Sequence, residues 1–156
     1  MADFISMDGD FLETTAAMLK ELEDLDKAVR EEIMEKALDE SAEILIAEQK
    51  RILRNHPNVK IQAFADYIKK WAKYKGRNKM TMAVGYDTPT LRKDLKFVYV
   101  EFGRRGGRRD KKGRKIGEVR PYSHIRAAWW NKKEEVNNRI AEVVNEEIEK
   151  RWNGGR

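Results

Sequence analysis

The stretch KMTMAVGYDTPTLRKDLKFVYVEFG, residues 79–103, decides the expected fold class, because its apolar residues no longer recur at helical spacing. In residues 79–87, larger side chains alternate with smaller or polar ones, which predicts a half-buried strand. Residues 95–103 are rich in β-branched and aromatic side chains and predict a second strand. The segment between them, TPTLRKD, is interpreted as a turn or loop, and KIGEV at 115–119 allows a third short strand.

Helices are expected on both sides of this hairpin, because apolar residues there recur every three or four positions. The predicted helices span residues 10–24, 25–54, 60–75 and 121–152. Pro57 ends the second helix, and Ser123 is the expected N-cap of the last one. The expected core stripes of the two long helices are Leu25, Val29, Ile33, Ala37 and Ile44 in the first, and Ile125, Trp129, Val136, Ile140, Val144 and Ile148 in the second.

These elements predict an α+β fold in which long N-terminal and C-terminal helices pack on a small antiparallel sheet with a long hairpin loop. The chain of 156 residues has the size of a single domain, so residues 1–156 are expected to form one. Residues 1–9 are expected to be a flexible N-terminus.

The hairpin loop, RRGGRRDKKGRK at 104–115, carries most of the positive charge of the chain. It holds eight basic side chains and one acidic one, more than the whole net charge of +6. Its three glycines and its like charges predict a flexible loop. The candidate interaction residues are its cations: Arg104, Arg105, Arg108, Arg109, Lys111, Lys112, Arg114 and Lys115.

Two kinds of partner suit this loop. Eight cations can neutralise phosphates of a nucleic acid with an affinity that depends on salt and ignores sequence. No aromatic residue lies between Arg104 and Arg120, so the loop offers no base stacking. An acidic surface on a protein suits the same cations, and the loop sequence leaves both alternatives open.

A second charge asymmetry divides the first half of the chain. Residues 1–48 hold fifteen acidic and four basic side chains, whereas residues 49–78 hold nine basic and one acidic. Oppositely charged ends favour head-to-tail contacts between copies of one protein. Solvated faces of a monomer would give the same composition, so charge alone does not decide between them.

The sequence contains no pattern typical of an active site. It has no cysteine, and its two histidines, His56 and His124, lie far apart. His124 is expected to be a structural histidine, and neither a nucleophile motif nor a phosphate-binding glycine loop is present. We therefore expect no enzymatic activity, no metal and no cofactor. The N-terminal residues do not resemble a signal peptide and no apolar run suits a membrane span, so we expect folding in a cytoplasm and no membrane partner.

Several short motifs resemble the small neck, or minor tail-component, proteins that complete the head–tail joint of long-tailed bacteriophages and prophages. The resemblance covers roughly residues 25–145, in order and in spacing. Family members commonly carry a TG-x-L stretch after the proline, where this chain has residues 60–75. The matching residues are Ala47, Lys50, Pro57, Gly85, Tyr86, Tyr99, Val100, Glu101, Phe102, Gly103, Pro121, Ile125, Arg126 and Ala128.

The resemblance implies a structural protein of the head–tail interface, a neck or tail-completion component that acts in virion assembly. It implies a homo-oligomeric ring, for which a hexamer is one candidate, with adjacent head-closure and tail proteins as partners. Such a protein would be made in the host bacterial cytoplasm and end in the virion. A sequence-independent nucleic-acid-binding protein that uses residues 104–115 is the alternative, and non-specific contact with genomic DNA is compatible with both.

Overall fold

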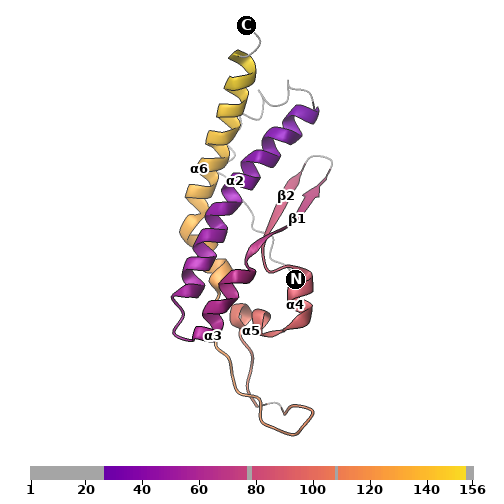
Figure 1. Ribbon diagram of the computed structural model, residues 1–156, viewed down its shortest axis with the longest axis vertical. Coiled ribbons are helices and arrows are strands. Elements are labelled where there is room, and N and C mark those ends of the chain that lie inside the picture. Colours follow the sequence, from indigo (N-terminus) through magenta and orange to yellow (C-terminus); the bar gives the residue numbers. More distant parts are fainter. Residues whose placement is uncertain (1–26, 77–78, 108, 154–156) are drawn as a thin grey trace.

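Two long antiparallel helices form the spine of the protein. The computed structural model describes residues 27–76, 79–107 and 109–153. Helix α2 (Lys27–Arg54) and helix α6 (His124–Asn153) run side by side (Figure 1). Neither contains glycine or proline, the two residues that most strongly disfavour a helix interior. Both confirm the long helices predicted from the sequence; the helix predicted at 10–24 lies outside the described residues.

A hydrophobic core fills the interface between the first half of α2 and the second half of α6. The predicted stripes supply most of it, while Val29, Ile44 and Trp129 are partly buried at its margin. Burial of such aliphatic side chains contributes about 1.5–3 kcal/mol each, which makes this interface a main source of stability. The buried members are Ile33, Ala37, Val136, Ile140, Val143, Val144 and Ile148.

A buried glutamate also joins the two long helices. Both oxygens of Glu48 accept hydrogen bonds from Arg51, each 2.7 Å long, and Asn131 of α6 donates a third at 2.8 Å. Hydrogen bonding to Arg51 lowers the pKa of Glu48 to about 2. The carboxylate is therefore charged at neutral pH. Its hydrogen bond from Asn131 links α6 to α2 at this level of the two helices.

A second core lies at the other end of the spine, around the C-terminal half of α2. Helix α3 (Val59–Gln62), the 3-10 helix η1 (Ala63–Tyr67) and helix α5 (Lys96–Phe102) are the short elements there. The aromatic rings of Phe64 and Tyr86 both pack on Phe97, with centroids 4.4 and 4.7 Å away. The buried members of this core are Ile46, Leu53, Ala65, Ile68, Tyr86, Phe97 and Val100.

The sheet has two antiparallel strands and lies beside α2 (Figure 1). Strand β1 (Lys69–Lys75) pairs with β2 (Met80–Gly85), with Lys69 opposite Gly85 and an irregularity between Lys70 and Ala72. Strand β2 confirms the first predicted strand. Helices packed on this small sheet confirm the predicted α+β class.

The predicted helix at 60–75 is wrong in its second half. Its first half is helical, as α3 and η1, and buries Ala65 as the pattern predicted. Residues 69–75 form β1 instead, because β2 supplies backbone partners along one edge and α2 supplies acidic partners for the strand lysines. Lys70, for example, lies 2.9 Å from Asp39 and 2.7 Å from Glu43.

The predicted strand at 95–103 is also wrong, because these residues form α5. Phe97, Val100 and Glu101 are buried, at the i, i+3 and i+4 positions of a helix face. The presumed turn before it is helix α4 (Thr88–Lys93), which Asp87 caps by accepting a hydrogen bond from Thr90 N at 2.9 Å. The strong β propensity of FVYV is overridden by packing of one helical face into the second core.

No strand forms at 115–119 either. The β-type pairing in this region consists of two isolated bridges, which join Arg104 to Val119 and Arg109 to Lys115. Among the helices of the described residues, none is long and apolar enough to cross a membrane.

Candidate interaction site: the basic arm

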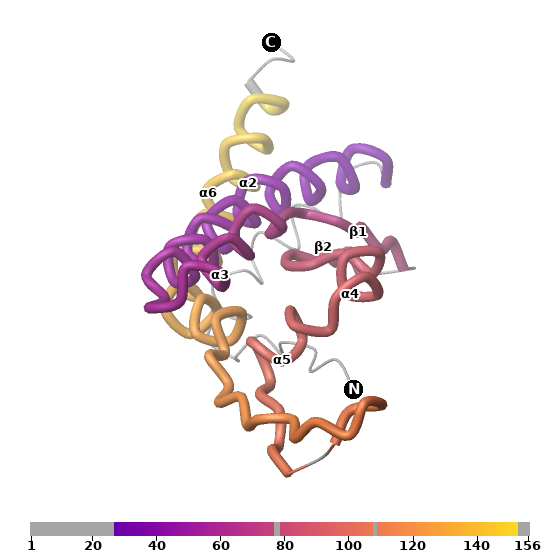
Figure 2. Tube along the Cα trace, turned by 60° about the horizontal axis from the view of Figure 1, so that its bottom comes forward, coloured from indigo at the N-terminus to yellow at the C-terminus, as the bar shows by residue number. Residues whose placement is uncertain are grey.

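Residues 104–119 form a projection in which the chain runs out and back, and we call it the basic arm. It leaves the body at the end where α3, α5 and the start of α6 meet, opposite the C-terminal end of α6 (Figures 1 and 2). Arg104 N donates to Val119 O at 2.8 Å, and Val119 N donates back to Arg104 O at 2.9 Å. A further bond joins Gly107 N to Ile116 O at 3.3 Å, so the two sides of the arm stay paired beyond its base.

The tip of the arm is a turn organised by Asp110. Oδ1 of Asp110 accepts hydrogen bonds from the backbone N–H groups of Lys112 and Arg114, both 2.9 Å long. Its Oδ2 accepts from Arg114 Nε at 2.8 Å, and Gly113 N closes the turn on Asp110 O at 2.9 Å. The backbone bond from Arg114 lowers the pKa of Asp110, so it is ionised at neutral pH. Gly113 has a φ of 75°, which suits glycine.

Replacing Asp110 with alanine is expected to open this turn without unfolding the body. Hydrogen exchange at the amides of Lys112 and Arg114 should become faster, because both lose their acceptor. The body should stay folded, because Asp110 belongs to neither core. Asp110→Asn keeps an oxygen at Oδ1 that can accept the same backbone bonds and serves as the matched control, so its amides should exchange more slowly than those of Asp110→Ala. Wild-type exchange rates in Asp110→Ala would show that the carboxylate does not organise the tip.

The predicted cations divide into those held by the arm and those left exposed. Arg104 donates to Gly117 O at 3.0 Å and lies over the ring of Tyr99, and Arg109 donates to Gly113 O at 2.8 Å. Arg114 pairs with Asp110, and Arg108 lies outside the described residues. Four other cations are exposed like Arg109 and Arg114, but their side chains make no hydrogen bond or ion pair within the described part of the chain: Arg105, Lys111, Lys112 and Lys115.

The base of the arm is fixed by Glu101, the buried glutamate at the end of α5. Its side chain is 3% exposed and accepts hydrogen bonds from Ile125 N at 3.0 Å and Arg126 N at 3.4 Å. These are first-turn donors of α6, which have no partner inside the helix. Glu101 thus caps α6 and ties it to α5, on the two sides of the arm.

Ser123 occupies the predicted N-cap position, because its carbonyl oxygen accepts the hydrogen bond of Ala127 N at 2.8 Å. Its hydroxyl does not cap the helix backbone. Its backbone has a φ of 51°, and the hydroxyl donates to Glu101 O at 3.2 Å and accepts from Arg126 Nη2 at 3.3 Å. The carboxylate of Glu101, from a neighbouring element, accepts the first-turn backbone bonds instead. The lone acidic residue inside FVYVEF was a usable signal for this role, which was not predicted from the sequence.

Two more residues lie close to the base of the arm. Tyr122 N donates to Val100 O at 2.7 Å, and its hydroxyl donates to Ile52 O of α2 at 3.1 Å. His124 is completely buried, and burial lowers its pKa to about 4. Its Nδ1 lies 3.2 Å from Oε2 of Glu101, yet neither ring nitrogen meets hydrogen-bond geometry with the described residues.

Gly103 is the point where the chain leaves α5 and enters the arm. Its backbone has φ 76° and ψ 178°, a conformation open almost only to glycine. A Cβ atom there would lie 2.9 Å from both Pro121 Cδ and Val119 O. The two sides of the arm can therefore approach this closely only with glycine at 103.

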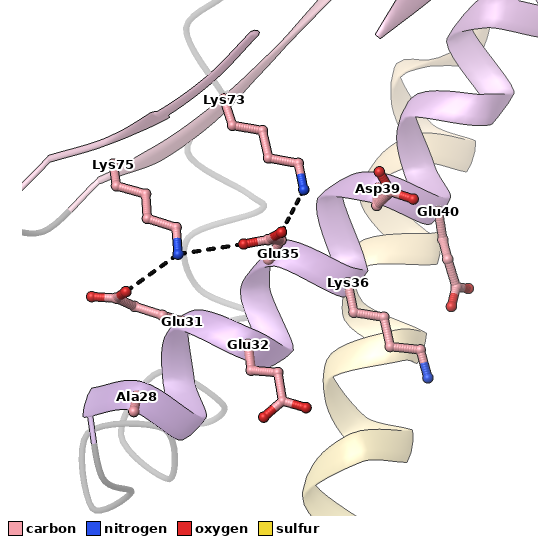
Figure 3. A pocket seen from close by; sticks show the side chains of 9 residues that line it. All are labelled: Ala28, Glu31, Glu32, Glu35, Lys36, Asp39, Glu40, Lys73 and Lys75. Carbon is pink, nitrogen blue, oxygen red and sulfur yellow. Dashed lines mark hydrogen bonds and ion pairs between the residues drawn. The ribbon is translucent and has the colours of Figure 1, made fainter. Parts of the chain in front are cut away.

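Elsewhere on the protein, opposite charges meet within the chain. A shallow groove between α2 and β1 is lined mainly by charged residues (Figure 3). Lys73 pairs there with Glu35, and Lys75 lies 3.4 Å from both Glu31 and Glu35. Part of the charge asymmetry that suggested contacts between copies is thus used inside one copy. No cluster of potential metal ligands occurs among the described residues.

A comparison with known proteins gives one result. The family model described as "Bacteriophage HK97-gp10, putative tail-component" matches residues 16–103, more than half of the chain. The match contains α2, the sheet and α5, and it ends at Gly103, where the arm begins. No curated protein and no solved structure matches the chain significantly.

Proposed function

The chain belongs to the HK97-gp10-like family of bacteriophage tail components, and we propose that it acts at the head–tail interface as a neck or tail-completion ring. Several copies assemble around the channel through which the genome passes, next to head-closure and tail proteins. Synthesis and assembly take place in the host bacterial cytoplasm, and the product is part of the virion. The protein works through its surfaces, without catalysis, metal or cofactor.

The main observation in support of this proposal is the basic arm, whose base is held to the body by hydrogen bonds. An arm that projects from the body adds nothing to either core, so its stability depends on the pairing at its base and tip. Four of its exposed cations, Arg105, Lys111, Lys112 and Lys115, have no partner within the described residues. Projecting charge of one sign suits recognition of a neighbouring molecule, because complementary potentials orient the encounter.

Deleting the gene from the phage that encodes it is the direct test. We expect the lysate to contain filled heads and separate tails, with few joined virions in negative-stain images and a large fall in plaque titre. Supplying the protein from a plasmid should restore both. Normal joined particles in the deletion lysate would contradict the proposed role, whereas aberrant tails without a joining defect would place the protein within the tail instead.

Sequence-independent binding of nucleic acid by the arm is the second candidate, favoured by the same exposed cations. Every one of its contacts would be to phosphate, since the arm carries no aromatic residue. Binding to a 30-base-pair duplex should then fall steeply as salt is raised. Tight duplex binding by a protein that remains monomeric would favour this candidate over a ring.

A further inference from the structure

A second stretch with a large net charge is the segment that precedes α2. Residues 1–26 carry eight acidic side chains and one basic one, a net charge of −7. Residues 104–115 carry eight basic side chains and one acidic one, a net charge of +7. The two stretches are therefore equal and opposite in net charge.

Many charges of the body are matched within one copy. All four lysines of β1 and several cations of α2 and α6 are paired with acids of the same copy. Arg139 of α6 lies 2.6 Å from Glu40, Lys36 lies 2.7 Å from Glu147, and Arg151 lies 3.2 Å from Glu32. The arm places four exposed cations close together in the sequence, and none of the four has such a partner within the part of the chain that the structure describes.

The length of α2 limits which acids of the same copy can reach the arm. Residue 26 adjoins Lys27, the first residue of α2, and the arm lies beyond the other end of that helix (Figure 1). A helix of 28 residues is about 42 Å long. Glu21, Glu23, Asp24 and Asp26 lie within six residues of Lys27, a reach of at most about 20 Å. These four carboxylates cannot reach the arm of their own copy.

We propose that the basic arm of one copy binds the acidic segment, residues 1–26, of a neighbouring copy. This inference rests on the proposed function and names the partner of the arm within it. The contact joins the arm to a different part of the chain, a segment connected to α2 at the other end of that helix, and is therefore head-to-tail. Repetition of a head-to-tail contact closes into a ring when the rotation between copies allows it.

A charge exchange in the full-length protein tests the inference. The arm variant carries Arg105→Glu, Lys111→Glu, Lys112→Glu and Lys115→Glu, which spares every contact that shapes the arm. The segment variant carries Glu21→Lys, Glu23→Lys, Asp24→Lys and Asp26→Lys. Each variant should self-associate at least tenfold more weakly than the wild type in sedimentation velocity. A protein with both sets of changes should regain association, because complementarity is restored with the signs exchanged.

Cross-linking identifies the contact itself. A zero-length carbodiimide reagent should join carboxylates of residues 1–26 to arm lysines in the wild type. In an equal mixture of isotopically labelled and unlabelled protein, linked peptides of mixed label should appear. Thermal unfolding monitored by circular dichroism checks that both variants remain folded, and the restored association of the combined variant excludes a folding defect as the cause.

Three results would overturn the inference. The first is a segment variant that assembles like the wild type, and the second is a set of cross-links confined to single copies. The third is a wild type that stays monomeric without cross-links between copies. Loss of duplex DNA binding in the arm variant, with unchanged self-association, would assign the arm to nucleic acid instead. None of these affects the gene-deletion experiment, so the role in head–tail joining can stand while the inference fails.

Discussion

Replacing Glu101 with alanine is expected to lower the free energy of unfolding by about 3 kcal/mol, because the change leaves buried first-turn donors of α6 without an acceptor. Ile125 N and Arg126 N both lose the carboxylate to which they donate. For a domain of this size, that loss corresponds to roughly 6–12 °C in Tm. Urea unfolding followed by circular dichroism gives the free energy directly.

Two variants make the result specific to capping. Glu101→Gln keeps an amide oxygen that can accept one of the two hydrogen bonds, so its loss should be about half as large. Glu149→Ala removes an exposed carboxylate from the same helix and should change stability by less than about 0.5 kcal/mol. Wild-type stability in Glu101→Ala would mean that the start of α6 does not depend on this cap.

Replacing Gly103 with alanine is expected to cost about 2 kcal/mol and to separate the two sides of the arm at its base. The positive φ is strained for any residue with a Cβ, and the added methyl group would lie 2.9 Å from Pro121 Cδ and Val119 O. Opening of the base relieves the clash, which limits the loss of stability. Hydrogen exchange at the amides of Arg104 and Val119 should therefore accelerate strongly.

Gly117 and Gly113 provide the controls for this effect. A Cβ at Gly117 meets nothing within 4 Å, and its φ is not in the positive range, so Gly117→Ala should be nearly neutral. Gly113 has a φ of 75° but open space around it, so Gly113→Ala should cost about 1 kcal/mol from backbone strain alone. If Gly103→Ala lowered the free energy of unfolding no more than Gly117→Ala does, the base of the arm would not require glycine.

The elements that were predicted correctly are those whose sequence pattern is regular and lies within the element itself. Uninterrupted helical periodicity identified α2 and α6, and it placed Ile33, Ala37, Val136 and Ile140 in the core. Alternation identified β2. Each of these signals agrees with the tertiary environment, so local preference and packing point to the same structure.

The errors arose where local preference and packing disagree. FVYV favours a strand, yet α5 forms because Phe97 and Val100 must face one side, into the second core. Residues 69–75 fit a helix by periodicity, yet they pair with β2 and place Lys73 and Lys75 on the acids of α2. A single sequence does not reveal which distant segment will supply those partners.

Prediction of the candidate site was limited in a similar way. The composition located the arm and its cations, because a run of like charge is visible without any structure. It did not separate Arg104, Arg109 and Arg114, which hold the arm together, from the four exposed cations that make no such contact within the described residues. That difference depends on carbonyl and carboxylate positions across the hairpin, which only the folded backbone provides.

The closed base of the arm has an evolutionary consequence. Because the backbones of Arg104 and Val119 are hydrogen-bonded to each other, the chain enters and leaves the arm at nearly the same place. Insertions, deletions or exchange of everything between them would leave α5, α6 and both cores in position. The arm can therefore diverge as an interchangeable module, adapting one phage lineage to a new neighbour while the body stays the same.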